Sequence, residues 1–400
     1  MDKPKIRFKG YTEAWEQRKL SDVFQEYSEK NHPELPALTI IQGGGTVLRE
    51  ESDRNLQYDK SSLSGYKMVC ENDFIVHLRS FEGGLEKSSH KGLISPAYHT
   101  FHGDNVDSRF YYSYFRSYEF IKHKLVPHVY GIRDGRSIDI DGMRTIEIPY
   151  TSYEEQKKIG DYIESLDHLI TLHQRKCDET KKLKKYMLQK MFPQNDEKIP
   201  EIRFSGFTEA WEQRKFSELC DMVTVGIANS ATHAYSDSGI VMFRNQNIKP
   251  NFLDDNDIIH IKPEFESGYK NKRLKKNDLL VARTGYPGTA CVVPEKYENS
   301  QTFTTLIARP KNSVNPYFLC QYLNSDIGVK YFESTQIGGG QKNSGAGILN
   351  EMPVMLPSGI EEESKIAEYF TNLDHLITLH QHKCDELQKL KKFMLQNMFV

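Results

Sequence analysis

The chain repeats two blocks of its own sequence, in the same order, within 400 residues. Residues 4–21 (PKIRFKGYTEAWEQRKLS) and 200–217 (PEIRFSGFTEAWEQRKFS) are identical at 14 of 18 positions. Further on, residues 154–192 and 361–399 are identical at 27 of 39 positions and share the run LDHLITLHQ. Whatever this chain folds into must therefore contain the same local frame twice.

The two segments between the repeated blocks, residues 22–153 and 218–360, scarcely resemble each other. At 132 and 143 residues, each is long enough to bury a core of its own. One frame that holds two different fillings suggests two recognition units, because a catalytic domain has no evident need of such a layout. We expect a first recognition domain over 1–152, a first helix over 153–192, a linker over 193–199, a second recognition domain over 200–359 and a second helix over 360–400.

The second repeated block predicts one long helix in each copy. Residues 154–192 contain no proline before Pro193, and apolar residues recur at alternating steps of four and three, which is the spacing of a coiled-coil seam. A 39-residue helix is roughly 58 Å long, and two copies related by a two-fold axis would pair antiparallel. The predicted seam positions are Ile159, Ile163, Leu166, Ile170 and His173 in the first copy and Ile366, Phe370, Leu373, Ile377 and His380 in the second.

The histidines of the seam do not have the spacing of a metal site. His168 and His375 precede His173 and His380 by five residues, whereas ligands on one helix face are usually four apart. We interpret the seam histidines as residues that set the helix register, and we expect no metal.

The composition of the chain excludes several classes of protein. The net charge of −2 argues against a protein that coats nucleic acid by bulk charge, although Lys270–Lys276 and the stretch from Arg109 to Arg136 are locally basic. Either stretch could be a solvated surface or a DNA contact. No run approaches the roughly 20 apolar residues of a membrane span, and the N-terminus has no signal-peptide core. The six cysteines form no CxxC pair, so we expect reduced thiols in a cytoplasmic protein.

Each recognition segment reads as an α+β domain. Strands are expected at Phe74–Leu78, Leu279–Ala282 and Cys291–Val293, and helices at Asp107–Lys124 and Pro316–Phe332. The sequence Asn315-Pro-Tyr-Phe lacks the second proline of the NPPF box of adenine methyltransferases. We expect Asn315 to cap a helix instead.

The two segments share a faint pattern in which a strand delivers an arginine and an aromatic residue onto a glycine-containing loop. Arg79 and Phe81 lie in one segment, and Arg283 and Tyr286 lie in the other. Arginine can bond guanine O6 and N7 bidentately or hold a phosphate, although pairing with a carboxylate inside the fold would explain the same residue. Further polar loops supply the candidate DNA contacts Tyr130, Arg133 and Arg136, then Arg244, Asn245 and Gln246, and finally Gln341, Lys342 and Asn343.

The order of a WEQRKL-type block, a variable segment and an EEQKKIGDYIESLDHLI-type helix, repeated once, resembles the specificity subunit of a Type I restriction–modification system over essentially the whole chain. The resemblance implies two target recognition domains that each read one half of a bipartite, asymmetric DNA target. It also implies that the helices set the spacer and dock two modification subunits, which carry S-adenosylmethionine and methylate adenine. Two restriction subunits complete the implied complex, and this chain would bind no cofactor and no membrane and catalyse nothing.

Two other classes of function remain to be weighed. An autonomous methyltransferase or nuclease would need a cofactor or metal motif, and the sequence contains no HExxH, no G-x-S-x-G and no P-loop. A coiled-coil scaffold would use the long helices but would leave the two large, divergent segments unexplained. Sequence-dependent DNA binding distinguishes the scaffold from the specificity subunit.

Overall fold

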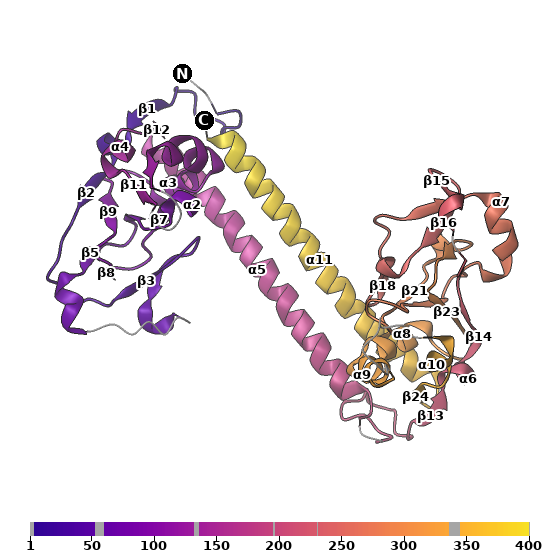
Figure 1. The fold of residues 1–400 in the computed structure, drawn as a ribbon. Helices are drawn as coiled ribbons and strands as arrows, with labels where there is room; N and C mark the ends of the chain where they lie inside the picture. The colour runs from indigo at the N-terminus through magenta and orange to yellow at the C-terminus, as the bar shows by residue number, and fades with distance from the viewer. Residues whose placement is uncertain are drawn as a thin grey trace. The chain divides into compact units, whose positions relative to one another are not determined.

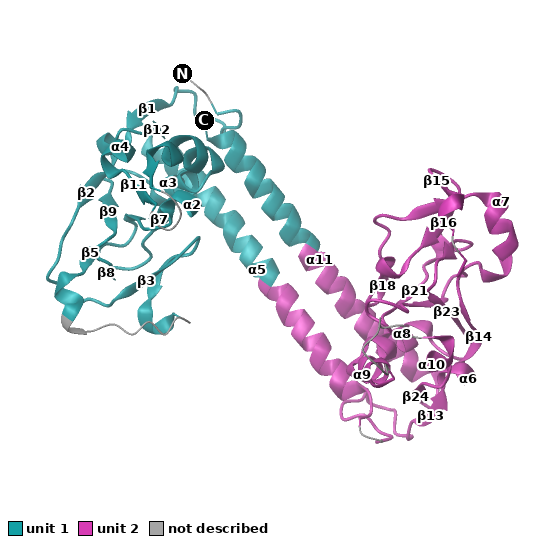
Figure 2. Ribbon diagram, in the orientation of Figure 1, with its two compact units in different colours: residues 1–174, 382–400 teal, residues 175–381 magenta. Residues whose placement is uncertain are grey.

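The computed structural model describes residues 4–52, 60–131, 136–194, 197–229, 231–335 and 345–399 (Figure 1). The chain divides into two compact units: unit 1 contains residues 1–174 and 382–400, and unit 2 contains residues 175–381 (Figure 2). Two long helices, α5 (Tyr153–Met191) and α11 (Ile360–Met398), contribute to both units. Each unit therefore consists of one recognition segment and one part of each long helix.

The recognition segment of unit 1 is an α+β fold around a four-stranded antiparallel sheet of order β2-β9-β6-β7, with smaller pairs β3-β4, β5-β8 and β10-β11. Its elements are β1 (Glu16–Lys19), α1 (Leu20–Val23), β2 (Gln25–Tyr27), β3 (Leu38–Ile41), β4 (Gly45–Leu48), β5 (Lys67–Val69), β6 (Phe74–Val76), α2 (Ser80–Gly83), β7 (Glu86–Lys87), β8 (Gly92–Ile94), β9 (His99–His102), α3 (Ser108–Phe115), β10 (Val129–Tyr130), β11 (Ser137–Ile138), α4 (Ile140–Arg144) and β12 (Glu147–Tyr150). A π-helix spans Glu119–Leu125.

Unit 2 contains two four-stranded sheets, β14-β23-β20-β21, which is antiparallel, and β15-β19-β16-β22, in which β16 and β22 are parallel. Its elements are β13 (Glu212–Lys215), α6 (Phe216–Leu219), β14 (Cys220–Val225), β15 (Tyr235–Ser236), β16 (Ile240–Phe243), β17 (Ile248–Lys249), β18 (Phe252–Leu253), β19 (Ile259–Ile261), α7 (Pro263–Glu266), β20 (Leu279–Val281), β21 (Ala290–Val292), β22 (Gln301–Thr302), β23 (Leu306–Pro310), α8 (Pro316–Asn324), α9 (Asp326–Ser334), α10 (Ala346–Asn350) and β24 (Pro353–Leu356).

The predicted strands are confirmed, and the two predicted helices of the segments are each interrupted. The first ends at Phe115 and resumes as the π-helix at Glu119. The second breaks at Ser325, whose backbone is extended and whose hydroxyl donates to the carbonyl of Tyr322 at 2.6 Å. Such local side-chain bonds compete with the helix. The expected cap is confirmed, because the Asn315 side chain accepts from the amides of Tyr317 and Phe318.

The first repeated block ties each segment to the start of the long helix that follows it. In unit 1, β1 pairs with β12, and Arg7 forms a bidentate ion pair of 2.6 and 2.8 Å with Glu155. In unit 2, β13 pairs with β24, and Arg203 holds Glu362 in the same way at 2.6 and 2.7 Å. Both carboxylates are almost fully buried. Their ion pairs with arginine offset the free-energy cost of removing the two charges from water.

The long helices pair antiparallel within each unit, as predicted. In unit 1, Lys391 forms an ion pair with Asp167, and Cys384 lies 3.6 Å from the Gln174 side chain. The equivalent contacts in unit 2 join Lys184 to Asp374 at 2.5 Å and Cys177 to Gln381 at 3.7 Å. The predicted seam positions face inward: six of the ten are buried apolar residues, Leu373 included, and Ile170, Ile377, His173 and His380 are half-buried. Leu387, which continues the seam spacing of the second copy beyond His380, packs into the core of unit 1.

One substitution between the two copies of the block places an acid where the other copy has an amide. The Glu363 side chain is buried and accepts from the amide of Asn315 at 2.7 Å, whereas its counterpart Gln156 accepts from the amide of Asp107 at 3.0 Å. Burial raises the pKa of Glu363 to about 7. Between about pH 4.5 and 7 the unfolded chain loses a proton that the folded chain keeps, so the stability of unit 2 should fall across this window and stay level above it.

Replacing Glu363 with Gln should remove this pH dependence. We expect Glu363→Gln to stabilise unit 2 by about 1–3 kcal/mol at pH 8 and by little at pH 4, measured as the free energy of local opening by hydrogen exchange. The matched variant Gln156→Glu should destabilise unit 1 at pH 8. Equal effects of Glu363→Gln at both pH values would show that Glu363 does not titrate in this window.

Candidate nucleic-acid interface

The structure brings together two of the predicted polar loops of unit 2. Residues Arg244–Asn247 follow β16, and residues 283–288 follow β20. The Asn245 side-chain oxygen accepts from the amide of Arg283 at 2.8 Å, and its amide nitrogen donates to the Thr304 hydroxyl at 3.3 Å. Asn245 therefore supports the backbone of the arginine loop.

Within the same surface, Arg244 and Gln246 converge on one carboxylate. Arg244 donates to the Asp257 carboxylate at 2.9 Å, and Gln246 donates to it at 2.7 Å. Asp257 is exposed and has a positive φ of 53°, so it stands on a tight turn at the protein surface. A DNA phosphate would be an equivalent partner for Arg244, because phosphate, like carboxylate, offers two oxygens that accept hydrogen bonds from one guanidinium.

Tyr286 is one of the predicted contacts that the structure leaves exposed. Its side chain is 84% exposed at the tip of the loop, while Arg283 beside it is half-buried. Gly288 at the end of the loop has a φ of 91°, and a Cβ there would lie 2.2 Å from the ring of Phe332. The glycine thus lets the loop cross α9 closely and present Tyr286 to the outside.

In unit 1 the corresponding residues are arranged differently. Arg79 is exposed at the start of α2, but Phe81 is only 8% exposed and belongs to the core, so its face is not available to a base. Arg136 lies over the Phe81 ring, 5.7 Å from its centroid, and Tyr130 is exposed nearby in the sequence on β10. The other predicted contacts, Arg133 in unit 1 and Gln341, Lys342 and Asn343 in unit 2, lie outside the described residues.

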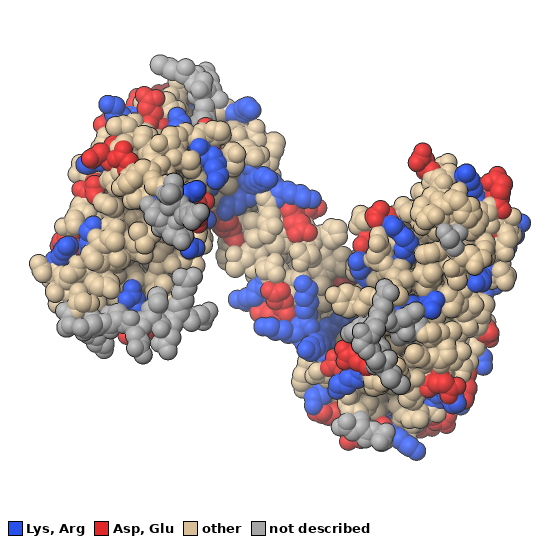
Figure 3. Space-filling model, in the orientation of Figure 1, with Lys and Arg blue, Asp and Glu red and all other residues tan. Residues whose placement is uncertain are grey.

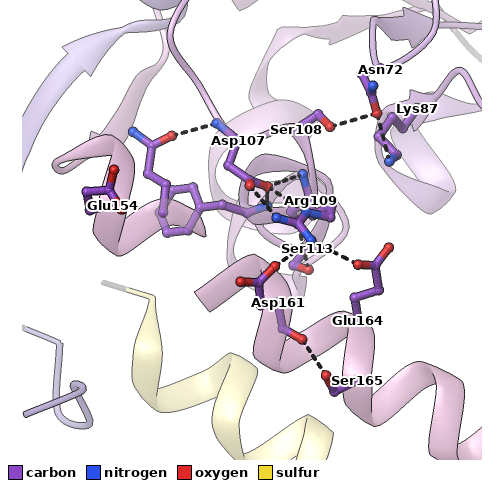
Figure 4. Close-up of polar contacts among 12 residues, drawn as sticks. Asn72, Lys87, Asp107, Ser108, Arg109, Ser113, Glu154, Asp161, Glu164 and Ser165 are labelled. Atoms are coloured by element: carbon purple, nitrogen blue, oxygen red, sulfur yellow. Dashed lines mark hydrogen bonds and ion pairs between the residues drawn. The ribbon is translucent and has the colours of Figure 1, made fainter. Parts of the chain in front are cut away.

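Several residues of the locally basic stretches pair with groups inside the fold. Arg109 pairs with Asp107, Asp161 and Glu164, as Figure 4 shows, and Arg116 pairs with the buried Glu86 at 2.6 Å. In unit 2, Arg273 holds Glu266 bidentately, Lys276 pairs with Glu295 and Lys272 donates to the carbonyl of Gly226. The sum of charges along a sequence window therefore overstated the basic surface, because it ignored acidic partners distant in sequence.

Besides the predicted seam, the long helices carry a second, exposed apolar stripe that was not predicted. Both copies of the helix expose apolar residues at equivalent positions. The sequence contained a sign of this stripe, because these residues are apolar although they lie outside the seam. The exposed residues are Leu169, Leu390 and Phe393 in unit 1 and Leu183, Tyr186, Leu376 and Leu379 in unit 2. Figure 3 shows Lys and Arg side chains gathered along the same helices. An apolar stripe of this kind on a paired helix is typical of a protein–protein contact.

Two further features concern metal binding and membrane insertion. Among the described residues, no group of three or more His, Cys, Asp and Glu side chains is arranged to hold a metal ion. Within the same ranges, no helix is both long and apolar enough to cross a bilayer. The candidate site consists of exposed loop residues in each unit, among them Arg79 and Tyr130 in unit 1 and Gln246 and Tyr286 in unit 2.

Comparison of this sequence with those of known proteins relates it to one class of protein. Residues 208–389 match the family model of the Type I restriction modification DNA specificity domain. The chain is also 22% identical, over 95% of its length and 91% of the relative, to the Type I restriction enzyme MjaVIII specificity subunit of Methanocaldococcus jannaschii. It is 23% identical over 51% of its length and 49% of the relative to the putative Type I restriction enzyme MjaX specificity subunit of the same organism.

Solved structures show the same fold. The crystal structure of a Type I restriction–modification S subunit from M. genitalium matches with a TM-score of 0.63 at 14% identity, covering 100% of this chain and 99% of that one. A chain from a study of complex assembly and conformational transition of the Type I system matches with a TM-score of 0.50 at 17% identity, over 96% and 97% of the two chains. These comparisons confirm the resemblance found in the sequence: residues 208–389 match a Type I DNA specificity domain, and the fold is that of a solved Type I S subunit.

Proposed function

We propose that this chain is the non-catalytic subunit that gives a Type I restriction–modification complex its DNA target. Each unit would read one half of a bipartite, asymmetric sequence, and the paired helices would set the unread spacer. The observation that carries the proposal is the coexistence of a repeated frame with two unlike loop surfaces. Two unlike surfaces predict two unlike half-sites. Such a chain would act with DNA in the cytoplasm.

The proposal assigns the chemistry to partners. Two modification subunits would carry S-adenosylmethionine and methylate an adenine in each half-site, and two restriction subunits would cut unmodified DNA. A repeated docking surface supports two copies of one partner. Leu183 and Tyr186 in unit 2 have the equivalents Leu390 and Phe393 in unit 1, and each pair lies three residues apart on one helix face.

The reading of half-sites is tested by paired substitutions in the two units. Arg283→Ala or Tyr286→Ala should weaken binding to the target by about tenfold to a hundredfold and relax sequence preference in one half only. Arg79→Ala or Arg136→Ala should do the same in the other half. The measurement is binding to a library randomised in both halves. Intact affinity with lowered thermal stability would show that these residues are structural.

Docking is tested by charge placed in the apolar stripe. Leu183→Glu with Tyr186→Glu should remove one modification subunit from the assembled complex, and Leu390→Glu with Phe393→Glu should remove the other, because an unpaired carboxylate in an apolar contact costs several kcal/mol. The stoichiometry is read from the mass of the complex. Lys185→Glu, a charge change at an exposed lysine of α5, is the control. A complex of unchanged mass in both double variants would exclude this surface.

A further inference from the structure

Unit 1 contains an open recess of about 780 Å³ between the turn after α3 and the last turns of α11. Ile170, Leu395 and Phe399 line it with apolar surface, and the 71% exposed Tyr118 borders it. Lys5 and Lys392 add positive charge, and neither forms an ion pair with another described residue. The exposed residues of the apolar stripe in unit 1 do not line this recess, so it is a separate surface.

The equivalent place in unit 2 is a smaller recess of about 370 Å³, and polar and charged side chains make up most of its lining. Asp326, at the start of α9, accepts from Gln189 at 2.8 Å. Gln321 of α8 donates to Asp374 at 2.9 Å. Glu201 forms an ion pair with Lys190. Two carboxylates and one amide therefore occupy this side of the helix pair in unit 2.

The two units can be matched residue by residue here, because Asp107 and Asn315 cap equivalent helices and Phe399 and Phe192 pack on equivalent rings, Phe110 and Phe318. This alignment places Tyr118 where unit 2 has Asp326, Ser113 where it has Gln321 and Lys5 where it has Glu201.

All three of these groups are thus replaced in unit 1. Two of the residues that contact them are kept, with Gln396 in place of Gln189 and Asp167 in place of Asp374, whereas Asn397 replaces Lys190. The carboxylates of Asp326 and Glu201 are lost, and Lys5 is gained while the ammonium of Lys190 is lost. The recess of unit 1 is the larger of the two; of the carboxylates that line it, Asp167 is paired with Lys391 and Glu119 lies at its border.

We propose that this recess binds an acidic, amphipathic segment of a partner protein, with one such segment for each copy of the chain. A carboxylate from the partner would take the place of Asp326 at Gln396 and would neutralise Lys5 or Lys392. An aliphatic or aromatic side chain next to it would cover Leu395 and Phe399. The volume lies within the range of about 300–1,000 Å³ that is usual for sites that enclose a ligand.

The apolar lining favours protein over nucleic acid as the occupant. A DNA backbone would satisfy Lys5 and Lys392 but would leave the faces of Ile170, Leu395 and Tyr118 uncovered. Because the equivalent recess in unit 2 is smaller and is lined by Glu197, Glu201 and Asp326, an acidic segment should bind at unit 1 only. A complex that is otherwise two-fold in its frame would thereby become asymmetric in its contacts.

The inference rests on the proposed function for the identity of the partners, so it is tested in the complex of the full chain with its modification and restriction subunits and DNA. A benzophenone amino acid is placed at Tyr118 and, as the matched control, at Asp326. We expect irradiation to cross-link position 118 to one acid-rich segment of one protein subunit, mapped by mass spectrometry, with at least about tenfold less product from position 326. Cross-linking to DNA, equal yields at both positions, or no product in an assembled complex would overturn the recess as a protein site. Failure of any complex to assemble would overturn the proposed function as well.

A plug variant gives an independent readout. Tyr118→Asp with Lys5→Glu introduces the two acids that stand at the equivalent positions of unit 2. This variant should lower affinity for a peptide of the cross-linked segment at least about tenfold while leaving the thermal stability of the chain unchanged. Asp326→Tyr with Glu201→Lys should not lower that affinity. Retention of the peptide by the plug variant within twofold would contradict the proposal.

Discussion

Removing one matched heptad from each long helix, residues 172–178 of α5 and 380–386 of α11, is expected to shorten the recognised spacer by about three base pairs. Seven residues of helix span about 10 Å and nearly two whole turns, and B-DNA rises 3.4 Å per base pair. The deletions remove Gln174 together with its partner Cys384, and Cys177 together with Gln381. The ion pairs Lys391–Asp167 and Lys184–Asp374 keep their register.

The outcome is measured as the methylated motif that the variant directs. Both half-sites should be unchanged and only the gap between them should be shorter. Deleting residues 172–178 alone is the control, and it should abolish methylation because α5 then slips against α11 by a whole heptad. A matched deletion that still directs the original spacer would show that the helices do not measure DNA.

The second large effect is expected at the ion pair between the helices in unit 2. Lys184 is 8% exposed, and its ammonium lies 2.5 Å from Asp374, which also accepts from Gln321. Lys184→Ala leaves a largely enclosed carboxylate without its cation. Because Asp374 keeps about a third of its surface in water, we expect a loss of about 2–3 kcal/mol rather than the larger cost of a fully buried charge.

The repeat supplies the control for this substitution. Lys391 and Asp167 form the equivalent pair in unit 1, but both side chains are more exposed there. Lys391→Ala should therefore cost no more than about 1 kcal/mol. Hydrogen exchange resolved over the two units measures both values. Equal losses in the two units would mean that burial does not set the strength of this pair.

The parts of the fold that could be predicted are those that one local pattern specifies. The 4-3 spacing of Ile159, Ile163 and Leu166 defines a buried helix face without knowledge of any distant residue. Asn315 before Pro316 specifies a helix start for the same reason. The break at Ser325 was not predicted, because the extended backbone there depends on how α8 and α9 each pack.

The candidate site was harder to predict because its residues acquire their roles from partners far away in sequence. The sequence predicts that the side-chain amide of Asn245 contacts adenine. In the fold the same side chain accepts a hydrogen bond from the backbone of Arg283, which is 38 residues away. Phe81 looked like an exposed aromatic by analogy with Tyr286, yet the core of unit 1 takes its side chain. Arg109 contributes a positive charge to its sequence window, but in the fold the carboxylates of Asp161 and Glu164 neutralise that charge. Local sequence cannot distinguish these roles, since the distinction is one of burial and pairing.

The measurement that tests the central claim most directly is genome-wide adenine methylation in a host that expresses this chain with its modification subunit. We predict a single bipartite motif with two unlike halves, methylated in both, that disappears when the chain is omitted and changes in one half only when Arg283 is replaced. A folded complex that methylates no such motif, or methylation that persists without the chain, would contradict the account.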